Sequence, residues 1–248
     1  MAENKLYVIP GSHPSLAASL MLERKGVPFK RVDMIPGPIK QLQLRAMGFP
    51  SDTVPALKLD GDKLQGSREI SRELDQRFPE LPLFPPDASD RTAVEEAERW
   101  GDEVLQPVAR RLIWNAQGRN HSTLTTYSEE ANLPVPGFLA SALAGPTVAM
   151  AKRRNHAGDE TVRRDLAELP AMLDRVDELI KGKVIGGDDP NAADYQIAPS
   201  IRLMMTLDDV RPAIESRPAA ELAMRILPHF PGRTPAVYPA DWLEPLRR

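Results

Sequence analysis

Apolar positions in the first eighty or so residues alternate between the spacing of strands and the spacing of helices. Short apolar runs bounded by turn residues predict strands, and apolar residues three and four apart predict helices. The hairpin in this region turns at Asp60-Gly61, a pair typical of tight turns. In chain order the sequence predicts a strand over 6–9, a helix that ends at Gly26, a strand over 27–33, a helix over 39–47, a hairpin over 54–65 and a helix over 67–78.

Beyond residue 78 the pattern changes to helices alone. Prolines at positions 79, 82, 85 and 86 prevent a regular element and predict an interdomain linker. Helical spacing then predicts one helix from an Asp90 cap to Gly118 and another that ends at Gly182. Asn191 is expected to cap a further, buried helix, with Asp194 reaching back to the N–H of the cap. We therefore predict an α/β domain over 1–80, a linker over 81–90 and an all-α domain over 91–248.

Two segments of the second domain are less regular. Residues 115–158 mix polar residues and prolines with a small-residue run over 140–144, and we interpret them as an elaboration that helps to shape a substrate pocket. The proline-rich tail over 228–245 is expected to be an extended segment packed on the surface. We find no convincing internal repeat.

Composition excludes several classes of function. The 248 residues carry a formal net charge of −3, and the basic residues are spread along the chain, which argues against nucleic-acid binding. The chain has no cysteine, which excludes disulfides, thiolate metal sites and a mechanism that uses the protein's own thiol. His121, His156 and His229 have no partners at metal-ligand spacing, so we assign no metal. Without a signal-type or membrane-length apolar run, we expect a cytoplasmic protein that does not bind membranes.

The segment with the most chemical information is Thr53-Val54-Pro55, followed by Leu64-Gln65-Gly66-Ser67 at the start of a helix. Proline lowers the cost of a cis peptide bond, and a cis Val54-Pro55 bond would present the Val54 backbone to an extended peptide. Free N–H groups at the start of the helix, beside Ser67, suit a carboxylate. Together with the βαβαββα order, these residues resemble the N-terminal domain of the cytosolic glutathione S-transferase superfamily.

This resemblance implies a fold, a co-substrate and a binding site. The fold is an α/β thioredoxin-like N-terminal domain followed by an all-α helical C-terminal domain, and the co-substrate is glutathione. The Val54 backbone would bind the cysteinyl part of glutathione, and Ser67 would bind the γ-glutamyl carboxylate. The family usually has Glu or Gln before that serine, where this chain has Gly66, so Gln65 is the candidate substitute and Arg68 would add positive charge. A homodimer is also implied.

Thiol chemistry at neutral pH requires a group that stabilises the glutathione thiolate, because a free thiol titrates near pH ~8.5. The resemblance puts this group just after the first strand, at the start of the first helix, where Ser12 lies. An ordinary helix cap explains Ser12 equally well. Ser15 is the neighbouring alternative and Tyr7 a weaker one. His13 is a candidate for tuning the site, although a lone histidine beside a turn is more often structural.

The resemblance also puts the pocket for the second substrate between the two domains, along the helix that follows the linker. Near the end of that helix lie Arg110, Arg111 and Trp114, with Tyr127 behind them. Two adjacent arginines would suit an anionic or carboxylate substrate, although each residue alone is more often a packing or surface residue. The sequence does not specify the electrophile.

The leading function is an enzyme that adds the sulfur of glutathione to a small electrophile, with isomerisation and dehalogenation as close variants. Ser12, Pro55 and Ser67 favour this enzyme. Gly66 favours the alternatives, which are a non-catalytic binding protein with the same fold or an enzyme that uses another thiol. A disulfide reductase of the thioredoxin type is disfavoured because the chain has no cysteine.

Overall fold

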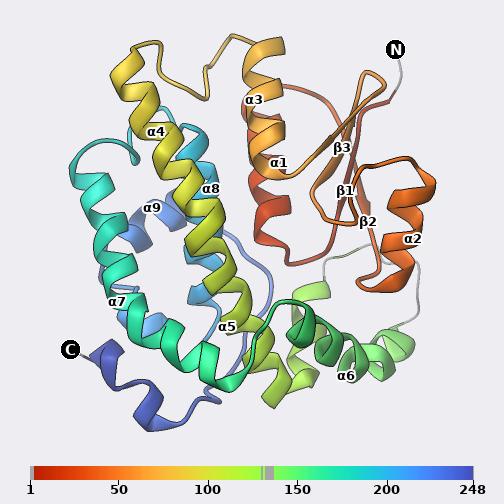
Figure 1. Cartoon of the computed structure of the whole chain (residues 1–248), viewed down its shortest axis with the longest axis vertical. Helices are drawn as coiled ribbons and strands as arrows, with labels where there is room; N and C mark the ends of the chain where they lie inside the picture. Colours follow the sequence, from red (N-terminus) through yellow and green to blue (C-terminus); the bar gives the residue numbers. More distant parts are fainter. Residues whose placement is uncertain (1–2, 130, 132–136, 248) are drawn as a thin grey trace.

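The N-terminal part of the chain contains a four-stranded sheet with the strand order β2-β1-β3-β4, drawn in red and orange in Figure 1. The computed structural model describes residues 3–129, 131 and 137–247. The strands are β1 (Lys5–Val8), β2 (Lys30–Asp33), β3 (Ala56–Leu59) and β4 (Asp62–Gln65). β1 pairs in parallel with β2 and antiparallel with β3, and β3 forms a hairpin with β4. The predicted strands are confirmed, although the strand expected over 27–33 begins only at Lys30.

Helices cover both faces of this sheet. They are α1 (His13–Arg24), α2 (Pro38–Ala46) and α3 (Ser67–Arg77). Successive side chains of a strand point to opposite faces, and β1 shows the consequence. Leu6 and Val8 belong to the main core together with residues of α1 and α3, whereas Tyr7 packs against a smaller cluster that contains Leu44 of α2. The thioredoxin-like arrangement expected of the N-terminal part is confirmed.

The first helix of the C-terminal part is not uniform. α4 (Ala88–Trp100) continues into a π-helical turn (Gly101–Leu105) and then into α5 (Gln106–Arg119). The Asp87 side chain caps α4 by accepting hydrogen bonds from the N–H groups of Ser89 and Asp90, so the expected Asp90 cap is wrong. Pro107 has no N–H for a regular α-helical bond, and the wider π turn lies just before it.

The helix α8 (Ala192–Met205) is buried at the centre of the helical part, where α1, α4, α5 and α9 (Pro218–Ile226) pack against it. The other elements of this part are α6 (Gly137–Arg154), α7 (Asp159–Lys181) and 3₁₀ segments at His121–Ser128, Arg211–Ala213, Ala240–Trp242 and Glu244–Arg247. Every residue of α8 except Arg202 is buried. The Asn191 side chain accepts from the N–H groups of Ala193 and Asp194, and Asp194 accepts from the Asn191 N–H at 2.9 Å. The predicted capping box is confirmed.

The least regular part of the sequence forms a helix. The small-residue run over 140–144 lies within α6, which packs beside α5 and the 3₁₀ segment at His121–Ser128. Figure 1 shows α6, in green, near α2. Arg154, the last residue of α6, forms a bidentate ion pair with Asp52, at 2.6 and 3.1 Å. This ion pair at the end of α6 therefore connects the helical part to the loop before β3.

The C-terminal tail packs closely against the helical part. Tyr238 and Leu243 are buried, and the Tyr238 hydroxyl donates to the Leu112 carbonyl at 2.6 Å. Thr234 pairs as an isolated bridge with Leu207, just after α8. The tail packs on the helices as predicted, with aromatic and leucine side chains between the prolines burying their apolar surface, but it is not extended throughout, because its last part forms 3₁₀ segments.

One hydrophobic core runs through both parts of the chain. It includes Leu6 of β1, Leu112 of α5 and Ile201 of α8, all fully buried. The segment between α3 and α4 has no helix or strand, where the sequence predicts the linker, yet Leu83 and Phe84 within it are buried. The two parts share their interior, and the residue limits of the domains stay a prediction. Within the described ranges, no helix is both long and apolar enough to cross a membrane.

Candidate functional site

The turn before β3 has the geometry that the sequence predicts. The Val54-Pro55 peptide bond is cis, as expected. Val54 is half-buried and packs against the smaller core cluster. The Pro55 carbonyl accepts a hydrogen bond from the Gly66 N–H at 2.9 Å. This bond holds the turn against the start of α3.

Gln65 and Ser67, which the sequence assigns to the γ-glutamyl group, both have partners within the protein. The Gln65 side chain donates to the carbonyls of Ser51 and Thr53 and accepts from the Ser51 N–H, at 2.7 to 2.9 Å. The Ser67 hydroxyl donates to the side-chain carbonyl of Gln196 in α8 at 2.7 Å. In the described structure no side chain caps α3, so its first N–H groups are open to a carboxylate. The roles of Gln65 and Ser67 at glutathione stay predictions.

Arg68 belongs to a network of carboxylates. It lies 3.2 Å from Glu103 and 4.0 Å from Asp102, and its Nε lies 3.8 Å from Glu98. Burial raises the pKa of Asp102, and the charge of Arg68 opposes that rise. The positive charge of Arg68 is balanced within the protein, and its contact with glutathione stays a prediction. Among the residues that the structure describes, no group of three or more His, Asp or Glu side chains could hold a metal ion.

Ser12 lies between β1 and α1, at the N-cap position of α1. Its side chain accepts no hydrogen bond from the N–H groups of the helix. It accepts instead from the Ser15 hydroxyl, with 2.9 Å between the two oxygens. The Ser12 hydroxyl therefore keeps its own proton for another acceptor, and the positive end of the α1 dipole lies beside it. Both features suit a thiolate, whereas a side-chain cap role has no hydrogen bond to support it.

Tyr127 supports the turn that carries Ser12. Gly11, just before Ser12, has a φ of +67°, and a Cβ at Gly11 would lie 3.1 Å from the Cβ of Tyr127. The Tyr127 hydroxyl shares hydrogen bonds with the hydroxyls of Thr206 and Thr234, at 2.7 and 3.0 Å. Tyr127 is thus a buried structural residue that fixes the position of the Ser12 turn.

His13 is buried at the first turn of α1, with 3% of its surface exposed. Its Nε2 atom has no hydrogen-bond partner among the described residues. Burial lowers the pKa of His13 well below its usual range, and the charge of Arg110 lowers it further. A hydrogen bond with the Gln106 backbone acts in the opposite direction. His13 is therefore a neutral imidazole at physiological pH and brings no positive charge to the Ser12 turn.

We expect buried His13 to make the protein less stable in mild acid. Because the pKa of His13 is lowered by folding, below pH ~6.5 the unfolded chain binds a proton that the folded protein does not. The free energy of unfolding then falls by up to about 1.4 kcal/mol per pH unit. Urea unfolding between about pH 7.5 and 5 measures this slope. His13→Gln should flatten it, and His121→Gln, at an exposed histidine, should not; an unchanged slope in His13→Gln would refute the neutral assignment.

The two adjacent arginines of α5 have different surroundings. Successive side chains of a helix point about 100° apart, so neighbours face different partners. Arg111 forms a bidentate ion pair with Asp165 of α7, at 2.6 and 2.8 Å. Arg110 is half-buried, bonds to the Gln106 side chain and acts through its charge on His13. Trp114 packs against the main core. These contacts support a place near Ser12 for Arg110 and a structural role for Arg111.

Lys40 of α2 is a further candidate site residue, revealed by the fold. It is only 7% exposed, and its ammonium group has no hydrogen bond and no ion pair among the described residues. Burial lowers the pKa of Lys40, Arg154 lowers it further, and Asp52 opposes this. The stem of Lys40 is buried while its ammonium group keeps access to solvent and has no acidic partner in the described ranges, so that group is available to an anionic ligand. No sequence signal identifies Lys40, because a lysine on a short polar helix is normally exposed.

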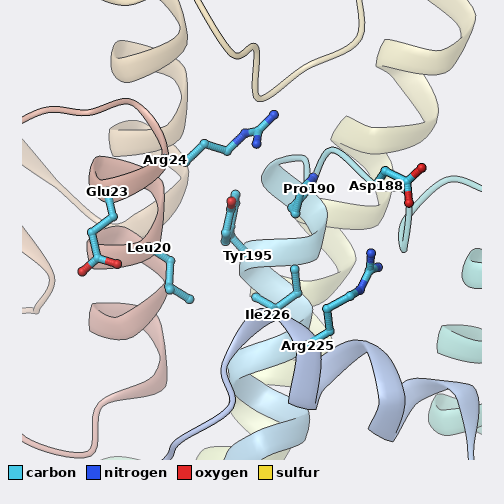
Figure 2. Close-up of a pocket in the computed structure, with 8 residues that line it drawn as sticks. All are labelled: Leu20, Glu23, Arg24, Asp188, Pro190, Tyr195, Arg225 and Ile226. Carbon is cyan, nitrogen blue, oxygen red and sulfur yellow. The ribbon is translucent and has the colours of Figure 1, made fainter.

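A surface hollow of about 380 Å³ lies away from these residues. Figure 2 shows that α1, α8, α9 and the loop before α8 surround it. It includes Leu20, roughly 12 Å along α1 from Ser12. Its arginines already have partners: Arg24 pairs with Asp189 at 3.2 Å, and Arg225 donates to two loop carbonyls. A second hollow of about 500 Å³ shares Leu20 with the first. We do not assign either hollow to thiol chemistry.

Comparisons with known proteins agree with the resemblance. Residues 6–82 match the family described as glutathione S-transferase, N-terminal domain. No curated protein matches the chain by sequence.

Several solved structures are similar to the whole chain. A beta-etherase, LigF, from Sphingobium sp. strain SYK-6 has a TM-score of 0.59 and 21% identity, covering 90% of this chain and 99% of its own. A glutathione S-transferase from Rhodospirillum rubrum F11 has a TM-score of 0.55 and 18% identity, covering 98% and 99%. A glutathione S-transferase from Methylobacterium radiotolerans, in complex with glutathione sulfonate, has a TM-score of 0.50 and 18% identity, covering 91% and 90%. At these identities the likeness shows a shared fold.

Proposed function

We propose a glutathione-dependent reaction for this chain, on the premise that it has the fold of the glutathione S-transferase superfamily and an N-terminal domain of that family. The protein binds glutathione, stabilises its thiolate and directs the sulfur to a small electrophile. We further propose that it acts as a homodimer in the cytoplasm, as the resemblance implies.

The observation that carries this proposal is the free hydroxyl proton of Ser12. Ser15 already donates to the Ser12 oxygen, so the Ser12 O–H is left to donate to the sulfur. This bond and the α1 dipole both favour the thiolate and lower the pKa of the bound thiol. The thiol proton passes to solvent, a sulfur lone pair forms the new bond to the electrophilic carbon, and the leaving group departs with its electron pair.

Three other groups are proposed to hold the rest of glutathione. The Val54 backbone, next to cis Pro55, pairs with the cysteinyl part. The N–H groups at the start of α3, at Ser67, bind the γ-glutamyl carboxylate. Lys40 binds the carboxylate at the other end of the peptide. The support for Lys40 is that its ammonium group, at the end of a buried stem, has no hydrogen bond and no ion pair among the described residues.

The test is a calorimetric titration of the purified protein with reduced glutathione at neutral pH. We expect binding, and we expect the bound thiol, titrated through its ultraviolet thiolate absorbance, to have a pKa below the ~8.5 of a free thiol. No binding of glutathione would refute the proposal. An electrophile screen should include ethers, because one of the similar structures is that of a beta-etherase.

A non-catalytic binding protein of the same fold is the second candidate. The observation that favours it is that the side chains of Gln65 and Ser67 are both engaged within the protein. Glutathione that binds with an unchanged thiol pKa would support this candidate over the enzyme.

We expect Lys40→Met to change ligand affinity and stability in opposite directions. Loss of a charged hydrogen bond should weaken glutathione binding about 10- to 100-fold. Because burial lowers the pKa of Lys40, its charged form is destabilised by folding, and its removal should raise the free energy of unfolding by about 0.5–2 kcal/mol. Calorimetry and urea unfolding measure the two effects. Lys181→Met, at an exposed lysine of α7, is the control and should change neither. Weaker binding together with lower stability would indicate that Lys40 has a structural role.

A further inference from the structure

Arg110 has hydrogen-bonding capacity that the protein does not use. A guanidinium group has five N–H donors, and the described contacts of Arg110 consist of one hydrogen bond, to the Gln106 side chain. In the described ranges no carboxylate oxygen lies within ion-pair distance of Arg110, whereas its neighbour Arg111 holds Asp165 with two bonds. Arg110 is half-buried, so its free donors are partly shielded from water and still accessible.

Arg110 also lies in a locally positive region. Burial lowers the pKa of Lys40 of α2, the charges of Arg154 of α6 and Arg110 of α5 both lower it further, and we call these three residues the basic cluster. Burial lowers the pKa of Arg110, and the charge of Arg154 acts in the same direction. Asp52 is the acid of this region, and both of its oxygens are held by Arg154. The basic cluster therefore has an excess of positive charge, in a chain whose net charge is −3.

Acids outside the basic cluster do not remove this excess. Asp102 stabilises the charge of Arg110, but it forms its ion pair with Arg68, at 4.0 Å, and accepts from the amides of Gln106 and Gln196. Arg111 is a further cation beside Arg110, and the neighbouring His13 is buried and neutral. A cationic group would be repelled here, and a neutral one would leave the donors of Arg110 unmet.

We propose that Arg110 binds an anionic group of the electrophilic substrate, a carboxylate or a similar oxyanion, so that this protein prefers anionic electrophiles. The inference rests on the proposed function, because it concerns the second substrate of the same reaction. Lys40 is taken by glutathione and Arg154 by Asp52, which leaves Arg110 as the member of the basic cluster with free donors. A planar guanidinium suits a carboxylate because it can donate two parallel hydrogen bonds.

The test compares two electrophiles that have the same reacting ring. One is a chlorodinitrobenzene with a carboxylate opposite the chlorine, and the other is its neutral ethyl ester. In both, the glutathione sulfur forms a bond to the ring carbon, chloride leaves with the bonding electrons, and the thiol proton goes to solvent. Rates are expressed as kcat/KM relative to the uncatalysed reaction. The wild-type protein should prefer the carboxylate.

The variants are Arg110→Met, which removes the charge, Arg110→Lys, which keeps it, and Arg163→Gln, which removes a distant exposed charge on α7. Arg110→Met should lower kcat/KM for the carboxylate about 10- to 100-fold, mainly through KM, and change the ester by less than about twofold. Arg110→Lys should recover part of the loss, and Arg163→Gln should resemble the wild type. Glutathione affinity, measured by calorimetry, should not change in Arg110→Met.

Each other outcome refutes a defined part of this account. An equal loss of kcat/KM for both electrophiles in Arg110→Met would mean that Arg110 does not bind the carboxylate of the substrate. A loss of glutathione affinity in Arg110→Met assigns Arg110 to glutathione and refutes the inference. If the wild-type protein binds no glutathione, the proposed function fails. The anionic subsite is then tested by calorimetry with the carboxylated compound alone, which should bind the wild type more tightly than Arg110→Met; equal affinities would refute the subsite.

Discussion

Ser12→Ala is expected to lower the rate of glutathione conjugation at neutral pH about 10- to 30-fold while glutathione still binds. The substitution removes the hydroxyl at the N-terminus of α1 whose oxygen accepts from Ser15 and whose proton is left to donate. Without that donor the pKa of the bound thiol should rise toward its free value of ~8.5, at which only about 3% is thiolate at pH 7. Calorimetry measures binding, thiolate absorbance measures the bound-thiol pKa, and turnover measures the rate.

Ser15→Ala is the matched control for this prediction. It removes the hydroxyl that donates to Ser12 but leaves the Ser12 proton in place, so it should reduce turnover much less. Ser12→Thr keeps a hydroxyl and should recover part of the activity. If Ser15→Ala were the more damaging of the two alanine variants, the thiolate donor would be Ser15, the neighbouring alternative.

Gly232→Ala is expected to destabilise the protein by about 2–4 kcal/mol. Gly232 has a φ of +88°, which disfavours a residue with a side chain. A Cβ at this position would lie 2.5 Å from the Cγ atom of the Tyr127 ring, which is too close for any side chain. The Tyr127 ring cannot move away without disturbing its hydrogen bonds to Thr206 and Thr234, so the clash is expected to weaken these bonds as well. Urea or thermal unfolding measures the change.

Gly61→Ala separates the cost of the positive backbone φ from the cost of the clash with Tyr127. Gly61 also has a positive φ, +106°, but nothing lies within 4 Å of a Cβ placed there. It should show only the backbone cost, about 1 kcal/mol. Equal losses in the two variants would mean that Tyr127 does not press on Gly232.

Local signals in the sequence were sufficient for much of the fold. The cis bond at Pro55 and the capping box of Asn191 and Asp194 depend on neighbouring residues, and both are confirmed. The cap of α4 shows the limit of such signals. Asp87 and Asp90 are both good caps, and the choice between them is decided by the geometry of the chain that enters the helix, which spacing does not encode.

The candidate site was less predictable, because its contacts join residues far apart in the chain. The sequence places Arg110 and Arg111 together, and only the folded position of Asp165 shows that Arg111 is already paired. Likewise, only the fold shows that the Ser67 hydroxyl donates a hydrogen bond to Gln196. Lys40 became a candidate because the folded chain buries its stem and brings Asp52 and Arg154 near it. Burial and pairing of this kind arise from tertiary structure and leave no local pattern.

The shared core has a consequence for how this protein can be taken apart. Residues 6–82, which match the family model, do not enclose their own interior. α1 lies against α8, and the buried Ser67 hydroxyl ends on Gln196 of that helix. Expressed alone, residues 6–82 would expose an apolar face to water, and the Ser67 hydroxyl would lose its hydrogen-bond partner. The stretch that matches the family model is therefore not expected to fold without the helical part of the chain.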